Sequence, residues 1–235
     1  MSRRRRSRAT GSSSADSTTT MAISIEDHQL PYDTHNLYDV NFYDDKIHTL
    51  VTHTPSFVNT WVADAQQNLH QNSNPIDHPL LVGLDIEWRP NRMRHIENPV
   101  ATIQLSTGKD CLIFQPLHCP TGIPQSLYDF LSNKTYTFVG VGIGSDVEKL
   151  VEDYELSVGN AVDLRGLVAE KFGAVDWKNA GLKRLVKEVL GREFEKRKRV
   201  TLSRWDNEWL TAAQVQYACL DAFLSYKIGE SLYAA

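Results

Sequence analysis

Four acidic residues and one tyrosine occupy positions where their side chains could meet at one reaction centre. Asp85 and Glu87 lie two apart in the apolar run LVGLDIEWRP, so both point to the same face of a predicted strand. Asp146 follows another predicted strand and opens a helix. Tyr217 and Asp221 are four apart on a late predicted helix, which places them on one face. These elements can converge at one edge of a sheet.

The chemistry expected of such a cluster is metal-assisted phosphoryl transfer. Clustered carboxylates repel one another unless cations lie among them, and carboxylate oxygens are hard ligands that suit Mg²⁺ or Mn²⁺. Two such ions about 3.5–4 Å apart can stabilise the attacking and leaving oxygens of an in-line displacement. The sequence therefore predicts a two-metal centre if the acids meet.

Each motif taken alone also fits a structural role. Asp85 and Glu87 suit the solvated face of a half-buried strand, and Asp146 suits a helix N-terminus, where the helix dipole favours an acid. Asp221 alone would be a surface acid and Tyr217 an aromatic residue at the edge of the core. The glycines before Asp146 suggest a dinucleotide loop, but their spacing is not GxGxxG, and the acid would repel a pyrophosphate.

The hydrophobic pattern predicts an α/β fold around these residues. We expect a hairpin over 34–53 and a helix from Pro55 to about residue 70. Three strand-like runs follow with no helix between them, so they are expected to be antiparallel neighbours: 80–87, 100–106 and 111–115. The later segments alternate as βα units do: helix 124–132, strand 136–141, helix 145–154, strand 160–164, and helices 165–172, 180–190 and 212–230. The result is a mixed sheet, with three antiparallel strands and then parallel strands, and with helices on both faces.

The chain divides into three segments by composition. Residues 1–20 carry five arginines and one acid among Ser and Thr, so we expect a disordered basic tail. This tail fits a nuclear localisation signal, an organellar transit segment, or a solvated tail preceding an internal start at Met21. Residues 21–79 form an extension that serves oligomerisation or covers a sheet edge. Residues 80–235 form the main domain. We expect a nuclear protein, with organellar and cytoplasmic locations left open.

Other features of the composition exclude several classes of protein. No run approaches the roughly 18 apolar residues of a membrane span, so no membrane partner is expected. The three cysteines are odd in number and lack CxxC spacing, which argues against a disulfide framework or a zinc site. The net charge is −4, yet residues 181–205 carry nine Lys or Arg and three Glu. An acidic body with one basic strip could hold a phosphate backbone on one side.

Three motifs resemble those of the DEDD exonuclease superfamily in its tyrosine form: DIE at 85–87, GSD ending at Asp146, and YACLD at 217–221. The surrounding stretches VGVGIGSDVEKL, VDLRGL and WKNAGLKRLVKEVLG are similar to the Werner-syndrome-type 3′-to-5′ exonuclease domain, over about residues 80–230. The resemblance implies a ribonuclease H-like fold. It also implies release of nucleoside 5′-monophosphates from the 3′ end of DNA or RNA.

The resemblance also implies a role for each residue. Asp85, Glu87 and Asp221 would hold the metal ion on the nucleophile side, Asp85 would bridge to the second ion, and Asp146 would support that ion. Tyr217 would orient or deprotonate the attacking water. Because a metal-bound water can ionise near neutral pH, a phenol with a pKa of about 10 need only position it.

Further residues are candidates for contact with the nucleic acid, although a solvated loop or core packing would explain them as well. Trp88 could stack on a terminal base. The cations of two basic segments could contact the backbone: Arg89, Arg92, Arg94, Lys196, Arg197, Lys198 and Arg199. Lys183, Arg184 and Lys187 are expected on the solvated side of a helix.

Two readings of function remain open. We find no helicase motif, so we expect a stand-alone nuclease domain, and RNA 3′-end trimming is one form of that activity. The alternative is a catalytically silent nucleic-acid-binding or assembly module on the same fold. Such a module could lose a carboxylate without penalty, whereas all five positions are filled here.

Overall fold

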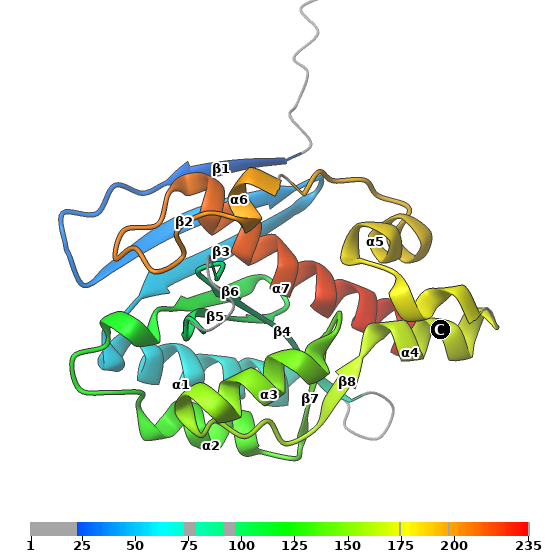
Figure 1. The fold of residues 1–235 in the computed structure, drawn as a ribbon, viewed down its shortest axis with the longest axis horizontal. Coiled ribbons are helices and arrows are strands. Elements are labelled where there is room, and N and C mark those ends of the chain that lie inside the picture. The colour runs from blue at the N-terminus through cyan, green and yellow to red at the C-terminus, as the bar shows by residue number, and fades with distance from the viewer. Residues whose placement is uncertain (1–22, 73–78, 92–96, 174, 197, 235) are drawn as a thin grey trace, which may run out of the picture.

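The computed structural model describes residues 23–72, 79–91, 97–173, 175–196 and 198–234, so the predicted tail over 1–20 lies outside them. Within these ranges, eight strands form one sheet in the order β1-β2-β3-β6-β5-β4-β7-β8 (Figure 1). The strands are β1 Ile23–Asp27, β2 His35–Phe42, β3 Asp45–Thr52, β4 Leu80–Trp88, β5 Val100–Thr107, β6 Asp110–Phe114, β7 Tyr136–Gly140 and β8 Ala161–Asp163.

The pairing of the central strands follows the sequence prediction. β4, β5 and β6 are antiparallel neighbours, and β7 and β8 continue the sheet in parallel from β4. The predicted hairpin is present as β2 and β3, and β3 runs parallel to β6, with His48 opposite Asp110. The N-terminal hairpin therefore covers the edge of the sheet at β6. The outermost strand, β1, was not predicted.

Helices cover both faces of the sheet, as predicted. α1 (Pro55–Asn72), α2 (Gln125–Ser132) and α3 (Ile143–Tyr154) pack on one face, and α4 (Leu164–Phe172), α5 (Leu182–Leu190) and α7 (Ala212–Tyr233) pack on the other (Figure 1). The remaining helical segments are short: α6 (Lys198–Thr201) and 3-10 turns at Pro116–His118 and Val175–Asn179. None of the helices described is long and apolar enough to cross a bilayer.

The side chains of β4 divide between the two cores. Val82, Leu84 and Ile86 lie in the core beneath α1 to α3, while Leu81 lies in the core beneath α7. This is the alternation that the sequence predicts. Asp85 and Glu87 consequently belong to the face that α7 covers.

α7 lies directly on β4 because position 83 is a glycine. A Cβ atom built at Gly83 would lie 2.0 Å from the carbonyl oxygen of Ala222. The two backbones can approach this closely only when the strand residue has no side chain. α7 begins with the predicted capping box, in which the side chain of Thr211 accepts a hydrogen bond from the backbone of Gln214.

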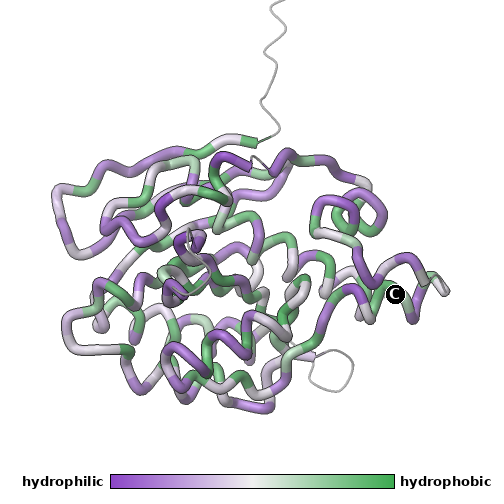
Figure 2. Tube along the Cα trace, in the orientation of Figure 1, coloured by the Kyte–Doolittle hydropathy of each residue, from purple (hydrophilic) through white to green (hydrophobic). Residues whose placement is uncertain are grey.

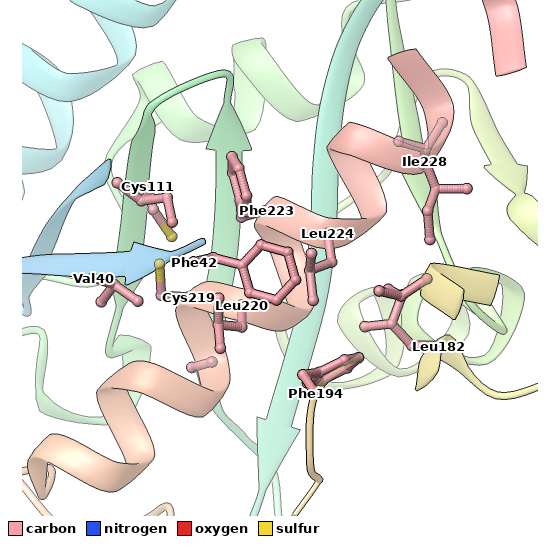
Figure 3. Close-up of a cluster of buried hydrophobic side chains, with 14 of the residues drawn as sticks. Val40, Phe42, Cys111, Leu182, Phe194, Cys219, Leu220, Phe223, Leu224 and Ile228 are labelled. Atoms are coloured by element: carbon pink, nitrogen blue, oxygen red, sulfur yellow. The ribbon is translucent and has the colours of Figure 1, made fainter. Parts of the chain in front are cut away.

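The rest of α7 is anchored by apolar packing. Figure 3 shows its side chains Leu220, Phe223 and Leu224 among Phe42 of β2 and Phe194 of the segment after α5. Thr49 of β3 adds a hydrogen bond to the sulfur of Cys219 at 3.2 Å. Figure 2 shows hydrophobic residues along α7, whereas the segment between α5 and α6 is largely hydrophilic.

Two local details differ from the sequence prediction. α3 begins at Ile143, two residues before the predicted start, because Gly142 adopts φ 79° and ends the strand early. Asp146 therefore lies within the first turn of α3. Residues 198–201 form the short helix α6 where a loop was predicted, and buried Val200 attaches this turn to the core.

Candidate active site

Three of the predicted acids form a tight cluster. Carboxylate oxygens of Asp85 and Glu87 on β4 and of Asp221 on α7 lie within 4.8 Å of one another. The contact between Gly83 and Ala222 explains this convergence. Gly83 and Asp85 share a strand face and Ala222 follows Asp221, so the approach of the two backbones also brings the carboxylates together.

All five predicted catalytic positions line one cavity of about 380 Å³. Asp146 and Tyr217 join the three clustered acids there, although Asp146 lies outside the group whose oxygens are within 4.8 Å. The structure thus brings the five residues together, three of them closely.

The acids raise one another's pKa values in the absence of a cation. Burial, and then the carboxylate of Asp221, raise the pKa of Glu87 to about 8. The same two causes raise the pKa of Asp85 well above its usual range. One oxygen of Asp221, Oδ1, is buried and has no hydrogen-bond partner among the described residues. The cluster is therefore short of positive charge, because Lys196 is the one cation among the described residues that line its cavity, and hard divalent cations fit this donor set.

Asp146 has a second acidic neighbour beyond the cluster. Burial, and then the carboxylate of Asp163, raise the pKa of Asp146 to about 7. Asp163 ends β8 and is held by Arg165, whose Nη2 donates to Oδ2 of Asp163 at 2.6 Å. Asp163 and Arg165, both in the VDLRGL stretch, thus lie beside Asp146 but are not among the residues that line the cavity.

Tyr217 keeps its proton at neutral pH. Burial, and then the carboxylate of Asp221, raise the pKa of its phenol to about 12. Its hydroxyl accepts a hydrogen bond from Oγ1 of Thr201 at 3.2 Å, and its ring packs against Trp205 with 5.9 Å between centroids. The phenol is therefore held in place as a neutral donor.

Lys196 is in the acidic cavity. Its Nζ lies 2.5 Å from Oδ2 of Asp221 and 5.0 Å from the centre of the Tyr217 ring. The sequence suggested a contact with the nucleic-acid backbone, and that contact stays a prediction. Sequence patterns could not reveal this pairing, because a long side chain in an aperiodic segment can reach many partners.

The other predicted contacts are scattered. Arg89 is in an ion pair with Asp206, with 3.1 Å between Nη1 and Oδ2. Trp88 lines the cavity and also packs against the core beneath α1 to α3, so both of its predicted roles remain compatible with its position. Lys198 and Arg199 are exposed on α6. The remaining predicted contacts lie outside the described residues: Arg92, Arg94 and Arg197.

The sequence analysis missed several residues that line the cavity, among them Thr201 and Leu202. Thr201 positions the phenol of Tyr217, as described above, and Leu202 lines the cavity although its side chain is 68% exposed. No periodic signal marks either position, because both lie where the short helix α6 ends.

Comparison with known proteins places this site in a family. A family model described as 3′-5′ exonuclease matches residues 59–234. A 3′-5′ exonuclease of Arabidopsis thaliana is 37% identical over 149 residues, which are 63% of this chain and 50% of that protein. The mouse bifunctional 3′-5′ exonuclease/ATP-dependent helicase WRN is 34% identical over 154 residues, which are 65% of this chain and 11% of that protein. The chain thus spans half or less of these relatives.

A solved structure supports the fold. The catalytic core of RRP6 from Trypanosoma brucei superposes with a TM-score of 0.61 at 17% identity, covering 79% of this chain and 46% of that one. The sheet is thus of the predicted ribonuclease H-like type, and the resemblance found in the sequence is confirmed. Because the family model spans most of the sequence, from within α1 to the end of α7, this chain belongs to the 3′-5′ exonuclease family.

Proposed function

We propose that this protein is a metal-dependent exonuclease that hydrolyses phosphodiester bonds at the 3′ end of DNA or RNA and releases nucleoside 5′-monophosphates. The observation that carries the proposal is the meeting of Asp85, Glu87 and Asp221 within 4.8 Å. Residues far apart in the sequence are brought together as a donor set for hard cations.

The cavity would hold two Mg²⁺ or Mn²⁺ ions. Asp85, Glu87 and Asp221 would hold one ion, and the unpartnered Oδ1 of Asp221 is available as a ligand atom. Asp85 and Asp146 would hold the other. Bound there, the ions would supply charge neutralisation at the phosphate and acidify a water molecule.

Tyr217 would position the attacking water. Its phenol has a pKa of about 12, so it carries a proton at neutral pH and is a poor proton acceptor. Thr201 donates to the phenol oxygen, so the phenolic proton is left for the acid cluster, where Asp221 is a hydrogen-bonding neighbour of Tyr217. This arrangement favours orientation of the water over its deprotonation by Tyr217.

The residues around the cavity suit the end of a nucleic-acid strand. Trp88 and the exposed Leu202 offer apolar surface to terminal bases, and Lys198 and Arg199 lie on the helix that leads to Leu202. Stacking and phosphate contacts of this kind tolerate any base sequence. They are also equally suited to DNA and RNA, so matched DNA and RNA substrates should be compared directly.

The test uses an oligonucleotide labelled at either end. With Mn²⁺, the 5′-labelled strand should give a ladder that shortens from its 3′ end, and the 3′-labelled strand should release labelled mononucleotide at once. EDTA should stop both reactions. Asp85→Asn should lower the rate at least about a hundredfold, because it removes a ligand shared by both ions.

Asp64→Asn is the matched control, since Asp64 lies on α1 and does not line the cavity of the acids. Its rate should equal that of the wild type. Intact strands in every reaction would refute the proposed activity. Binding of the strands without cleavage would instead support the silent binding module.

A further inference from the structure

Among the described residues, Lys196 makes the shortest contact of any cation with the acids of the cavity. The 2.5 Å ion pair joins it to Asp221, whose side chain is only 4% exposed. The side chain of Lys196 is 32% exposed, so it extends from the surface into the site. It comes from the hydrophilic segment between α5 and α6, which has no regular secondary structure.

Lys196 is also the one cation among the described residues that line this cavity, against four carboxylates. The guanidinium of Arg165 is paired with Asp163 instead, because it makes three hydrogen bonds to that carboxylate. In the metal-free protein, positive charge at the acid cluster therefore comes from a single ammonium group.

The same carboxylate has two possible cationic partners. Asp221 belongs to the group of three acids that can hold an ion, and it is also the partner of Lys196. An ammonium and a divalent ion on one carboxylate would lie within a few ångströms of each other and repel strongly in a partly buried site. Lys196 holds Oδ2 and the metal would take the free Oδ1, so the two cations compete for Asp221 through their mutual repulsion.

We propose that Lys196 is a built-in counterion of the metal site, which occupies Asp221 in the metal-free protein and must leave it when the ion binds. Lys196 would then set the metal concentration at which the site fills. This inference rests on the proposed function, since it requires that the three acids bind metal. A lysine suits such an exchange because its ammonium is a point charge on a flexible stem that can turn to solvent.

The ion pair also explains how the acids stay together without metal. Three closely spaced carboxylates would otherwise push α7 away from β4 or hold protons. With Lys196 in place, part of that repulsion is cancelled. The three carboxylates then stay close to the arrangement in which they would bind the ion. Removing the ammonium should therefore make the metal-free protein more dependent on metal for its stability.

The test measures Mn²⁺ binding to the full chain without any nucleic acid, by isothermal titration calorimetry and by melting temperature as a function of Mn²⁺ concentration. Lys196→Met keeps the length of the stem and removes the charge. Its half-saturating Mn²⁺ concentration should be lower than that of the wild type by roughly tenfold, and its melting temperature should rise further on Mn²⁺ addition.

Two controls separate this effect from a general change of charge. Lys134→Met removes an exposed lysine from the turn between α2 and β7, which does not line the acid cavity, and should bind Mn²⁺ as the wild type does. Lys196→Arg keeps the charge and should also stay close to the wild type. If Lys196→Met does not fold, Lys196→Gln serves in its place.

The outcomes distinguish this inference from the proposed function. Equal or weaker Mn²⁺ binding by Lys196→Met would overturn the counterion role while leaving the metal site intact. Failure of the wild type and of every variant to bind Mn²⁺ would overturn the metal site itself, and the counterion role with it.

Discussion

The two walls of the cavity are built differently. On one side β4 and α7 meet backbone to backbone at Gly83, and the acids that they carry are fixed by two packed cores. On the other side, residues 192–196 are irregular and residues 198–201 form one short helix, with charged and apolar side chains in contact with solvent. The difference indicates a division of work. The packed wall holds the ligands, and the exposed wall supplies groups that can move when ions and substrate arrive.

The largest effect is expected from damage to the packed wall. Gly83→Val would place side-chain atoms inside the carbonyl of Ala222 and force α7 off the sheet. We expect a loss of at least about 3 kcal/mol of unfolding free energy, measured by urea denaturation, together with loss of metal binding. Gly166→Ala is the control, because nothing lies within 4 Å of a Cβ at that position, and it should leave the stability unchanged or slightly raised. A stable, metal-binding Gly83→Val protein would show that the contact is dispensable.

The next effect concerns the raised pKa of Glu87 in the packed wall. The pKa of Glu87 is about 8 in the folded, metal-free protein, well above that of an unfolded glutamate. Between about pH 5 and pH 8 the folded state therefore keeps a proton that the unfolded chain has released, so stability falls as pH rises. In EDTA, the unfolding free energy of Glu87→Gln should fall less over this pH range than that of the wild type, by on the order of 2 kcal/mol. Urea denaturation at each pH measures the difference. An unchanged slope of unfolding free energy against pH would mean that the pKa of Glu87 is not raised in the folded protein.

A smaller effect is expected where the two walls meet, at Tyr217 and Thr201. Tyr217→Phe removes the hydroxyl that would orient the attacking water, so kcat should fall by about tenfold with little change in KM. Because the phenol has a pKa of about 12, the pH profile of kcat between pH 6 and pH 9 should keep its shape. Loss of one limb of that profile would identify Tyr217 as the proton acceptor instead.

The smallest effect is expected on the exposed wall. Leu202→Ser removes an exposed apolar side chain, so the unfolding free energy should change by less than about 0.5 kcal/mol. The KM for a single-stranded oligonucleotide should nevertheless rise a few-fold if Leu202 packs on a terminal base. A change in stability without a change in KM would place Leu202 in the packed wall and weaken the division between the two.

Much of the packed wall could be predicted from local patterns. The period of two in LVGLDIEWRP placed Asp85 and Glu87 on one face, and the capping box fixed the start of α7, so that Tyr217 and Asp221 share a face. That these elements meet could be expected only from the resemblance to known exonucleases. No local rule states that the glycine at 83 lies under residue 222.

The remaining features depend on contacts that local patterns do not encode. The parallel pairing of β3 with β6 joins segments about sixty residues apart, and β1 is too short to give a clear alternation. The partner of Lys196 was missed because the segment that carries it has no periodicity. The oligomeric state, the nuclear location and the role of the basic tail stay predictions.

The order of the ligands along the chain has a consequence for synthesis. Asp85 and Glu87 leave the ribosome long before Asp221, and α7 is also the helix that buries the sheet beside them. A nascent chain that has not been translated past codon 221 cannot assemble the three-acid cluster. A message ended by a stop codon before position 221 would therefore yield a product without this cluster.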